Sequence, residues 1–493
     1  MNEVVAPDAA PPAPLARIIP RDQHSISRAA VSPNALKVLY RLRDAGFEAF
    51  LVGGCVRDLM LGLTPKDFDI ATSALPEEVK RVFRNCRLIG RRFRLAHVFF
   101  GREIIEVATF RATAAPEAGD EPISDESLAT DEDESLIDDD SPTAFDDQDD
   151  LQSIDRVTDD SGRLLRDNVY GSIDEDVWRR DFSVNALYYN IADFSLWDYM
   201  GGFEDIAARR LRLIGDPVTR YREDPVRMLR AARFQAKLGF VLDPATSAPI
   251  ADLRQLLGGV PAARLFDETL KLFLTGHGAA SLDVLREWGL LEELLPTVAR
   301  SLAKSGDSAI VGMLRKGLEN TDARVAAGRP VTPTFLFSLL LYGPFATLIE
   351  KQQSERWHDI GTIVDSIDRA TRDAQARVAI PKRFTLGVRE MFAAQPRLEQ
   401  PRGRRALRML EQPRFRAAYD LLLLRAEFGL ASADVAHWWT VLQEVSQSDR
   451  EKMADSLASV GSGSDDGADG EGGAPRSRRT RGGRRRRRPS RPA

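Results

Sequence analysis

The chain has 493 residues, of which 43% are hydrophobic and 29% are charged, and its formal net charge is −5. This length exceeds what one hydrophobic core holds, so we expect two or three domains with looser segments around them. Two cysteines, Cys55 and Cys86, are too few for a disulfide framework or a cysteine-based zinc site, which favours a reducing, cytoplasmic setting. The apolar run 335–342 is far shorter than the roughly 20 residues of a membrane span, so we expect no integral membrane association.

Charge is concentrated in two opposed segments. Between 117 and 160 there are 19 Asp and Glu residues against one base, whereas 476–493 holds ten Arg residues and no acid. The acidic block has few aromatic residues and repels itself, which predicts a solvated insertion at about 114–160. The remaining chain is mildly basic, so its charge does not exclude binding of a polyanion.

Helices and strands are predicted to alternate in the first part of the chain. A disordered Pro/Ala-rich leader at 1–20 precedes predicted helices at 34–45, 56–61 and 76–84 and predicted strands at 48–52, 68–71, 95–100 and 104–110. Beyond the acidic insertion, the pattern predicts resumption at 164–167, a helix at 178–189, and strand–turn segments at 194–202 and 210–215. These elements predict a head domain at 21–215 with a mixed sheet, interrupted by the insertion.

From Tyr221 to about residue 455, apolar residues repeat every three or four positions, which predicts helices throughout. We therefore expect an α+β fold in which the head is followed by a helical neck at 216–275, which binds nucleotide and RNA, and a helical C-terminal domain at 276–455. A Gly/Ser/Asp linker and the Arg-rich tail, at 456–493, are expected to be disordered.

The sharpest local pattern is LVGGCVRDLMLGLTPKDFDIAT, residues 51–72. Gly53 and Gly54 end an apolar strand directly before a predicted helix, where backbone N–H groups can face an anion. Arg57 adds a planar fork of donors that suits phosphate oxygens. Alternate residues of a strand share a face, so Asp67 and Asp69 can hold the same divalent ions while Phe68 points into the core.

Phosphoryl transfer needs this kind of carboxylate pair, because metal ions activate the attacking hydroxyl and neutralise the leaving pyrophosphate. The sequence has no Walker GxxxxGK[ST] motif and no GxSxG elbow, and its five histidines show no ligand-like spacing. A lone Asp-x-Asp is usually a solvated turn, and a lone Gly-Gly an ordinary one. Their combination at this spacing is far more restrictive, and it favours Mg²⁺-dependent chemistry, with Mn²⁺ as the alternative ion.

These residues resemble the nucleotidyltransferase superfamily of DNA polymerase β, in the class shared by bacterial poly(A) polymerases and CCA-adding enzymes. Three further motifs of that class follow in order, namely RRDFSVNA (179–186), DYMGGFED (198–205) and EDPVRMLR (223–230). The resemblance is strong from about residue 17 to residue 274 and more diffuse in the helical remainder. It implies a template-independent nucleotidyltransferase that uses a nucleoside triphosphate and a divalent metal.

The resemblance implies that Asp181 is the third active-site carboxylate, with Arg180 and Asn185 binding the nucleotide. From the residues alone, Asp181 at a helix start could accept from a ribose hydroxyl or complete the metal site, and a surface ion pair with Arg179 is the alternative. Glu106, on a strand expected beside Asp69, could supply a metal ligand or a supporting hydrogen bond.

Asp224 and Arg227 are three residues apart, so on one helix they could meet a base edge together, with Arg230 directed toward phosphate. In the family this element reads the incoming nucleotide. Because such pairs are common on helices, a surface salt bridge is the alternative interpretation.

The choice between poly(A) and CCA synthesis depends on the flanking segments. RIIPRDQHSISR (17–28), NCRLIGRRFRLAHVFFG (85–101), LRDNVYGSIDEDVWRRDFSVNALYY (165–189) and the Arg-rich end resemble bacterial poly(A) polymerases. We therefore expect ATP as substrate, RNA 3′ ends of mRNA and small RNAs as acceptors, and RNA-decay proteins as candidate partners. A CCA-adding enzyme is the first alternative, and an inactive RNA-binding scaffold is a remote one.

Two Arg-rich stretches are candidate RNA contacts. A mobile basic tail attracts phosphates without sequence preference, although a solubility or protein-docking tail is the alternative. The basic stretch around Phe93 could contact RNA or the triphosphate, or could be a solvated strand face. The candidate residues are Arg91, Arg92 and Arg94 in this stretch and Arg484, Arg485, Arg486, Arg487 and Arg488 in the tail.

Overall fold

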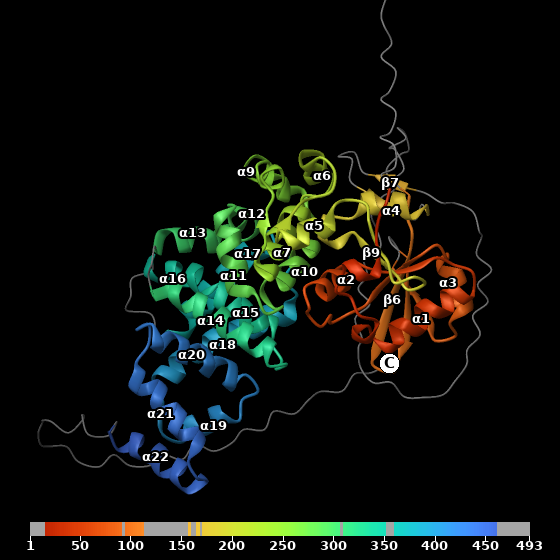
Figure 1. Cartoon of the computed structure of the whole chain (residues 1–493). Coiled ribbons are helices and arrows are strands. Elements are labelled where there is room, and N and C mark those ends of the chain that lie inside the picture. Colours follow the sequence, from red (N-terminus) through yellow and green to blue (C-terminus); the bar gives the residue numbers. More distant parts are fainter. Residues whose placement is uncertain are drawn as a thin grey trace, which may run out of the picture.

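The computed structural model describes residues 15–90, 94–112, 156–158, 164–167, 170–305, 309–351 and 359–460. A head built on a mixed sheet lies beside a long helical part, whose last helices extend away from the head (Figure 1). This arrangement agrees with the expected α+β fold. The predicted boundaries between head, neck and C-terminal domain stay predictions, because one continuous apolar core runs from the head through the helices to α20 (Phe415–Glu427).

An eight-stranded sheet forms the head, in the order β1-β10-β9-β2-β3-β6-β5-β4. Its neighbouring strands are antiparallel except β3 and β6, which are parallel. The strands are β1 (Arg17–Ile19), β2 (Ala49–Val52), β3 (Asp69–Thr72), β4 (Cys86–Ile89), β5 (Leu95–Phe100), β6 (Glu103–Thr109), β9 (Leu187–Asn190) and β10 (Leu196–Asp198). The position of β1 corrects the predicted leader at 1–20, because residues 17–19 pair with β10 and so belong to the head.

Helices cover the two faces of this sheet differently. On one face, α1 (Pro33–Asp44) contacts β2, β3 and β6, and α3 (Pro76–Val82) contacts β4, β5 and β6. On the other face, α4 (Ile173–Arg179) contributes Ile173 and Val177 to a second apolar cluster with Phe50, Ala71 and Tyr188. Asp69 alternates with Ile70 and shares the face of Ala71, so it lies on the α4 side of the sheet.

The predicted helix at 178–189 is wrong. The helix of this region is α4, which starts earlier because Ser172 and Glu175 form a capping box, and it ends where Arg180 becomes extended. A short 3-10 helix, η3 (Ser183–Asn185), follows, and β9 then begins. Tyr188 and Tyr189 are both buried, on opposite faces of the sheet, which suits an aromatic pair in a central strand better than in a helix.

The segment between β6 and α4 leaves and re-enters the head at one place. Arg111 and Tyr170 form an antiparallel bridge, and the N–H of Gly171 donates to the carbonyl of Phe110. Most of the predicted acidic insertion lies outside the described residues. Two strands near its end, β7 (Arg156–Thr158) and β8 (Leu164–Asp167), pair with each other.

The rest of the described chain is helical apart from one parallel strand pair, β11 with β12. The remaining elements are η1 (Arg21–Gln23), η2 (Arg28–Ala30), α2 (Gly54–Met60), α5 (Gly202–Ala207), β11 (Arg210–Leu211), α6 (Pro217–Glu223), α7 (Val226–Leu238), β12 (Val241–Leu242), α8 (Pro244–Ser247), α9 (Ile250–Leu253), η4 (Arg254–Gly259), α10 (Ala262–Phe273), α11 (Gly278–Glu287), α12 (Leu290–Leu294), α13 (Pro296–Ser305), α14 (Ala309–Ala326), α15 (Pro333–Leu340), α16 (Tyr342–Lys351), α17 (Ile360–Gln375), α18 (Lys382–Glu399), α19 (Gly403–Leu410), α20 (Phe415–Glu427), α21 (Ala433–Glu444) and α22 (Gln447–Val460). Helix α22 runs past the predicted domain end at residue 455.

A buried arginine joins the last helices to the rest. Arg425 on α20 is 1% exposed, and its guanidinium donates to Tyr342 and Gln395 and pairs with Glu399 at 2.5 Å. The final helices form a separate apolar cluster around Trp439. Arg425 therefore links α16, α18 and α20 at the point where the two clusters meet.

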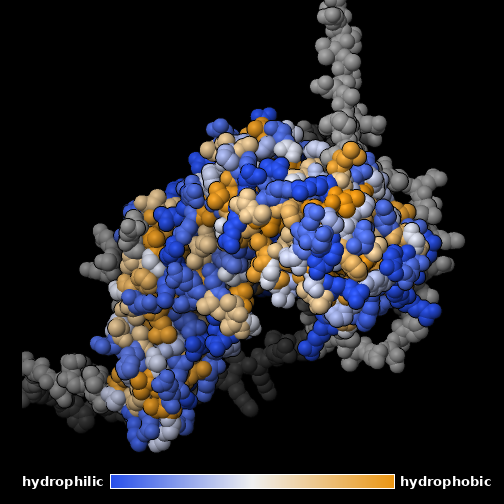
Figure 2. All heavy atoms as spheres, in the orientation of Figure 1, coloured by the Kyte–Doolittle hydropathy of each residue, from blue (hydrophilic) through white to orange (hydrophobic). Residues whose placement is uncertain are grey.

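Within the described residues, no single helix is long and apolar enough to cross a membrane, and only the bent pair α15 and α16 meets that test jointly by length and composition. Both cysteines are buried and free. The face of the molecule in Figure 2 mixes hydrophilic and hydrophobic residues and is hollowed between the head and the last helices.

Candidate active site

Gly53 and Gly54 connect β2 to α2, as the sequence predicts. Gly53 has a φ of +80°, which a residue with a side chain rarely adopts. A Cβ atom on Gly53 would lie 3.7 Å from Oδ2 of Asp69 and 3.9 Å from Nη1 of Arg180. The backbone of this turn therefore approaches both a carboxylate and a guanidinium closely.

The two carboxylates of the DFD motif lie at the start of β3. Asp69 is the first residue of the strand, Asp67 is exposed just before it, and Phe68 is 8% exposed and packs into the core. On the parallel neighbour β6, Glu106 pairs in register with Asp69, which confirms the predicted adjacency of these strands. Burial raises the pKa of Asp69 to about 6, Glu106 and Asp67 add to the shift, and Arg180 opposes it.

The mutual repulsion of these carboxylates fits a divalent cation. Within the described part of the chain, no group of three or more His, Cys, Asp or Glu side chains is arranged to hold one ion. Mg²⁺ commonly binds through one or two protein carboxylates and completes its shell with water and substrate phosphates. Asp67 and Asp69 supply that donor type, and Glu106 is the neighbouring carboxylate.

Asp181 lies beyond the end of α4 and binds Arg230 across the pocket. Arg230 donates to Oδ2 of Asp181 through Nε at 2.8 Å and through Nη2, while Oδ1 accepts from the N–H of Phe182 at 2.8 Å. Burial opposes ionisation of this carboxyl, but Arg230 prevails and lowers the pKa of Asp181 to about 2. Asp181 is therefore a charged anchor for Arg230 in this structure.

Asn185 connects this pair to the glycine turn. Its Nδ2 donates to Asp181 at 3.4 Å, and its Oδ1 accepts from Nη1 of Arg57 at 2.6 Å. Arg57 is only 2% exposed, and its remaining donors contact Asp58 at 2.6 and 2.9 Å. The Arg57 guanidinium, which was predicted to bind phosphate, therefore connects Asn185 to α2 in the wall of the pocket.

Arg180 is held from behind by two side chains. Its Nε donates to the hydroxyl of Tyr188 at 2.7 Å, and its Nη2 donates to Asp176 at 2.9 Å. The Tyr188 hydroxyl in turn donates to Asp176 at 2.8 Å. Burial alone would lower the pKa of Arg180, but Tyr188 and Asp176 raise it above its usual value. This triad leaves Nη1 directed toward Gly53 and Asp69.

Asp224 and Arg227 do not share a helix as predicted. Asp224 is extended after the end of α6, because the following Pro225 disfavours helical geometry, and α7 starts at Val226. Oδ2 of Asp224 accepts from Arg264 at 2.6 Å, whereas Nη1 of Arg227 contacts Glu223 at 2.9 Å. Both residues nevertheless line the same cavity.

The DYMGGFED motif belongs to the scaffold beneath this site. Asp198 accepts backbone N–H bonds from Met200, Gly202 and Phe203, so it closes the turn before α5. Asp205 is fully buried and accepts from the hydroxyl of Ser183 at 2.6 Å and from Arg210 and Arg212. This motif fixes η3, and η3 carries Asn185 into the pocket.

One cavity of about 500 Å³ gathers most of the predicted residues. Its lining comprises Gly53, Gly54, Arg57, Asp69, Arg179, Arg180, Asp181, Asn185, Asp224, Arg227, Arg230, Phe234, Lys237 and Arg264. Basic side chains outnumber carboxylates, which suits a polyphosphate. Asp67 and Glu106 lie beside Asp69 but outside this lining.

Sequence reasoning missed four lining residues, Arg179, Phe234, Lys237 and Arg264. Phe234 and Lys237 follow Arg230 on α7 at helical spacing, which was the available signal, whereas Arg264 comes from α10 through tertiary packing.

Of the candidate RNA contacts, Arg94 pairs with Glu77 at 2.7 Å. Arg91, Arg92 and Arg484 to Arg488 lie outside the described residues.

Comparisons with known proteins agree with this architecture. Family descriptions match over residues 49–212 (Poly A polymerase head domain), 239–302 (Probable RNA and SrmB-binding site of polymerase A) and 355–491 (Polymerase A arginine-rich C-terminus). Poly(A) polymerase I of Escherichia coli O6:H1 is 45% identical over 451 residues, covering 90% of this chain and 89% of that protein.

Two further comparisons concern CCA-adding and tRNA-processing enzymes. The CCA-adding enzyme of Lactobacillus helveticus is 33% identical over 260 residues, covering 53% of this chain and 54% of that protein. A solved structure described as a tRNA-processing enzyme in an apo form aligns with a TM-score of 0.52 at 20% identity, covering 85% of this chain and 99% of that one, which is a likeness of fold.

The sheet, its acidic edge and the adjoining basic cavity define a nucleotidyltransferase head joined to a helical body. The chain belongs to the poly(A) polymerase family. CCA-adding enzymes are the more distant relatives, so poly(A) synthesis is favoured over CCA addition.

Proposed function

We propose that the chain transfers AMP from ATP to RNA 3′ ends without a nucleic-acid template and releases pyrophosphate. The observation that carries the proposal is the position of Asp69, whose carboxylate lies beside the Gly53 turn in a cavity rich in arginine. The triphosphate fits the basic side of that cavity, and the RNA 3′ hydroxyl fits the carboxylate edge beside it.

Asp67 and Asp69 would hold Mg²⁺, or Mn²⁺ in its place, with Glu106 as a supporting carboxylate. Bound there, the metal would make the 3′ hydroxyl a better nucleophile and neutralise charge on the leaving group. Asp181 lies in the same cavity and pairs with Arg230, and its role as the third active-site carboxylate stays a prediction.

Arg180 is the side chain best placed to contact phosphate. Asp176 and Tyr188 fix its Nε and Nη2, and its Nη1 approaches the Gly53 turn. A guanidinium fixed in this way needs no reorganisation when the triphosphate binds, so it can stabilise charge that develops during transfer. Arg57 and Asn185 act behind it, by holding the turn and Asp181 in place.

Asp224, Arg227 and Arg230 would recognise the nucleotide. Asp224 offers an acceptor held in place by Arg264, and Arg227 offers a donor from the first turn of α7. An acceptor and a donor at fixed separation can form hydrogen bonds with the edge of one base. Protein side chains would then select the nucleotide without a nucleic-acid template.

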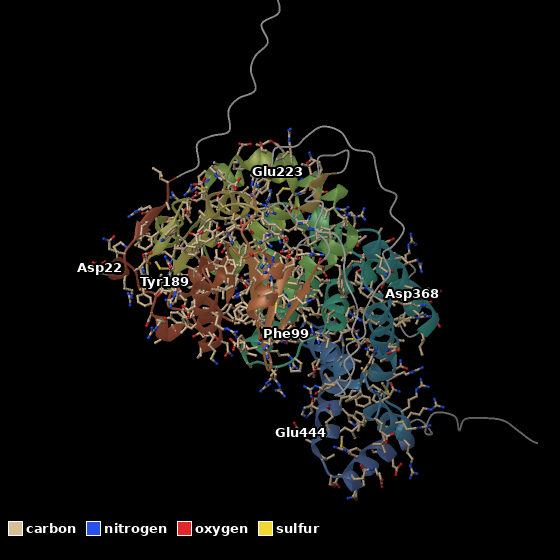
Figure 3. All side chains as sticks on the ribbon, turned by 90° about the vertical axis from the view of Figure 1, so that its right-hand side faces the viewer. Asp22, Phe99, Tyr189, Glu223, Asp368 and Glu444 are labelled. Carbon is tan, nitrogen blue, oxygen red and sulfur yellow. The ribbon has the colours of Figure 1, made fainter. Side chains whose placement is uncertain are left out.

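The direct test is incubation of the chain with Mg²⁺, an RNA primer and each labelled nucleoside triphosphate separately. Long extension with ATP alone is the expected result. Addition of C and then A confined to tRNA would show a CCA-adding enzyme instead, and absence of any incorporation would leave an RNA-binding scaffold. Asp69→Asn should abolish incorporation without unfolding the head, whereas Asp22→Asn, an exposed control labelled in Figure 3, should not.

We further propose that this activity marks mRNA and small RNAs for decay in the cytoplasm, together with RNA-decay proteins. The two free, buried cysteines are consistent with a reducing compartment. Measurement of transcript half-lives in cells that carry Asp69→Asn tests this role, and unchanged half-lives would contradict it.

A further inference from the structure

The sheet face that carries Asp69 continues beyond the cavity onto the two outer strands, β5 and β4. Helix α3 packs against these strands on the opposite face, where Ala96 and Val98 are buried. On the Asp69 face, alternate residues remain open to solvent. Arg87 is exposed, Ile89 is 45% exposed, and Ile104 is 43% exposed.

Register aligns four side chains of this face in a row across the strands. Asp69 pairs with Glu106, Glu106 with His97, and His97 with Arg87. Strands lie about 4.8 Å apart, so the row extends about 14 Å from the catalytic edge to the outer edge of the sheet. Along it, the side chains change from two carboxylates through an imidazole to a guanidinium.

An aromatic ring lies beside this row. Phe99 pairs with Ile104, and its ring centroid lies 6.4 Å from that of His97. The guanidinium of Arg87 lies over the Phe99 ring at 5.7 Å from its centroid. Figure 3 labels Phe99 on the lower part of the head. A partly exposed ring with a guanidinium over it is surface chemistry with which proteins hold single-stranded nucleic acid.

We propose that Arg87, His97 and Phe99 form a subsite for the single-stranded RNA segment immediately upstream of the 3′ end. The proposal rests on the proposed function, because that function places the 3′ hydroxyl at Asp67 and Asp69. A strand stacked at about 3.4 Å per nucleotide would cover the row with about four nucleotides. Its bases would stack near Phe99, and its phosphates would contact Arg87 and His97.

Such a subsite suits repeated addition of one nucleotide. Stacking on an aromatic ring does not read base edges, so the first additions can follow any RNA sequence. Each transfer then moves the strand one step outward along the same row. The growing tail remains bound near its end while the cavity is refilled with ATP.

The test uses the full chain with two variants on this face and two controls elsewhere on the head. Phe99→Ala removes the ring, and Arg87→Gln removes an exposed charge at little risk to folding. The controls are Arg81→Gln on α3, which lies on the other face, and Ile18→Ala on β1 at the opposite edge, where Ile18 is 56% exposed. We expect the KM for an oligo(A) primer to rise about tenfold in each face variant. The KM for ATP and the kcat at saturating primer should stay within about twofold of wild type.

A second measurement needs no catalysis. Primers with 4-thiouridine at successive positions upstream of the 3′ end are cross-linked without ATP, and the adducts are mapped by mass spectrometry. We expect adducts in peptides that contain β4 and β5, and fewer of them with Phe99→Ala. An unchanged primer KM in both face variants, or cross-links confined to other peptides, would overturn the subsite and leave this face to a protein partner. If the wild type extends no primer, the proposed function fails, whereas the cross-links still test the subsite.

Discussion

Replacement of Asp181 by Asn should destabilise the pocket by an amount that depends on pH. The side chain of Asp181 is 11% exposed and that of Arg230 is 33% exposed, so their charges are only partly screened by solvent. The pKa of Asp181 falls from its usual 3.8 to about 2 in the folded chain. At about 1.4 kcal/mol for each unit of difference between folded and unfolded pKa, the ionised carboxylate contributes about 2 to 3 kcal/mol at neutral pH.

The sign of the pH dependence follows from the lowered pKa. A carboxyl that is more acidic in the folded state stabilises the fold fully above its unfolded pKa, near 4, and loses that contribution as pH falls through its folded pKa. The difference in free energy of unfolding between wild type and Asp181→Asn, which we call the gap, should therefore be constant above about pH 5 and fall to about half near pH 3. The variant itself should show no such dependence from this position.

Hydrogen exchange of the Phe182 amide measures this gap locally. That N–H donates to Oδ1 of Asp181, so its exchange reports opening of the pair. Exchange in Asp181→Asn should be about 30- to 150-fold faster than in wild type at pH 7. At one pH the intrinsic exchange rate of this amide is similar in both proteins, so the ratio of their measured rates reports the difference in opening. Asp22→Asn provides the control. A gap that does not change between pH 7 and pH 3, or equal exchange rates at pH 7, would refute this account of Arg230 and Asp181.

Three further predictions concern the scaffold. Tyr188→Phe removes the hydroxyl between Arg180 and Asp176, so the KM for ATP should rise about tenfold in steady-state assays while the KM for primer stays unchanged. Gly202→Ala would place a Cβ atom 2.2 Å from the carbonyl oxygen of Ser183, so thermal unfolding should reveal a loss of about 1 to 3 kcal/mol or more. Arg425→Ala leaves Glu399 and Gln395 without their buried partner, so proteolysis should cleave the last helices faster, with about 3 to 5 kcal/mol lost locally.

Matched substitutions distinguish these effects from general damage. Tyr40→Phe also removes a hydroxyl, but one that accepts from exposed Arg28, so it should leave the KM for ATP unchanged. Gly258→Ala meets no atom within 4 Å and should be tolerated. Arg416→Ala removes an exposed charge from α20 and should not speed proteolysis. Equal behaviour of a variant and its control would contradict the corresponding prediction.

Local patterns were sufficient to predict the glycine turn and a strand at Asp69. The paired glycines after an apolar run and the apolar residues after Asp69 each constrain backbone geometry over a few residues, whereas Asp67 lies just before β3 and outside the strand. These features depend on neighbours in sequence or on strand chemistry alone.

The hydrogen-bond partners of the pocket residues could not be predicted from local sequence patterns. Arg230 reaches Asp181 across 49 positions of sequence, and Arg264 reaches Asp224 across 40, so each contact depends on how α7 and α10 pack. The helix predicted at 178–189 was wrong because the capping box at Ser172 and the strand preference of Tyr188 and Tyr189 act over a longer window than the RRDFSVNA motif. Tertiary packing therefore decided the two contacts, whereas local signals outside the motif decided the bounds of the helix.

The bridge between Arg111 and Tyr170 makes the head a closed structure without the acidic segment between them. Both ends of that segment meet at one backbone contact, so the chain between them can change in length or composition while β3 and β6 keep their register. Each doubling of such a loop costs only about 0.6 kcal/mol in chain entropy. The same junction is therefore a place where evolution can add regulatory sequence, or where a fluorescent domain can be inserted to follow the enzyme in living cells.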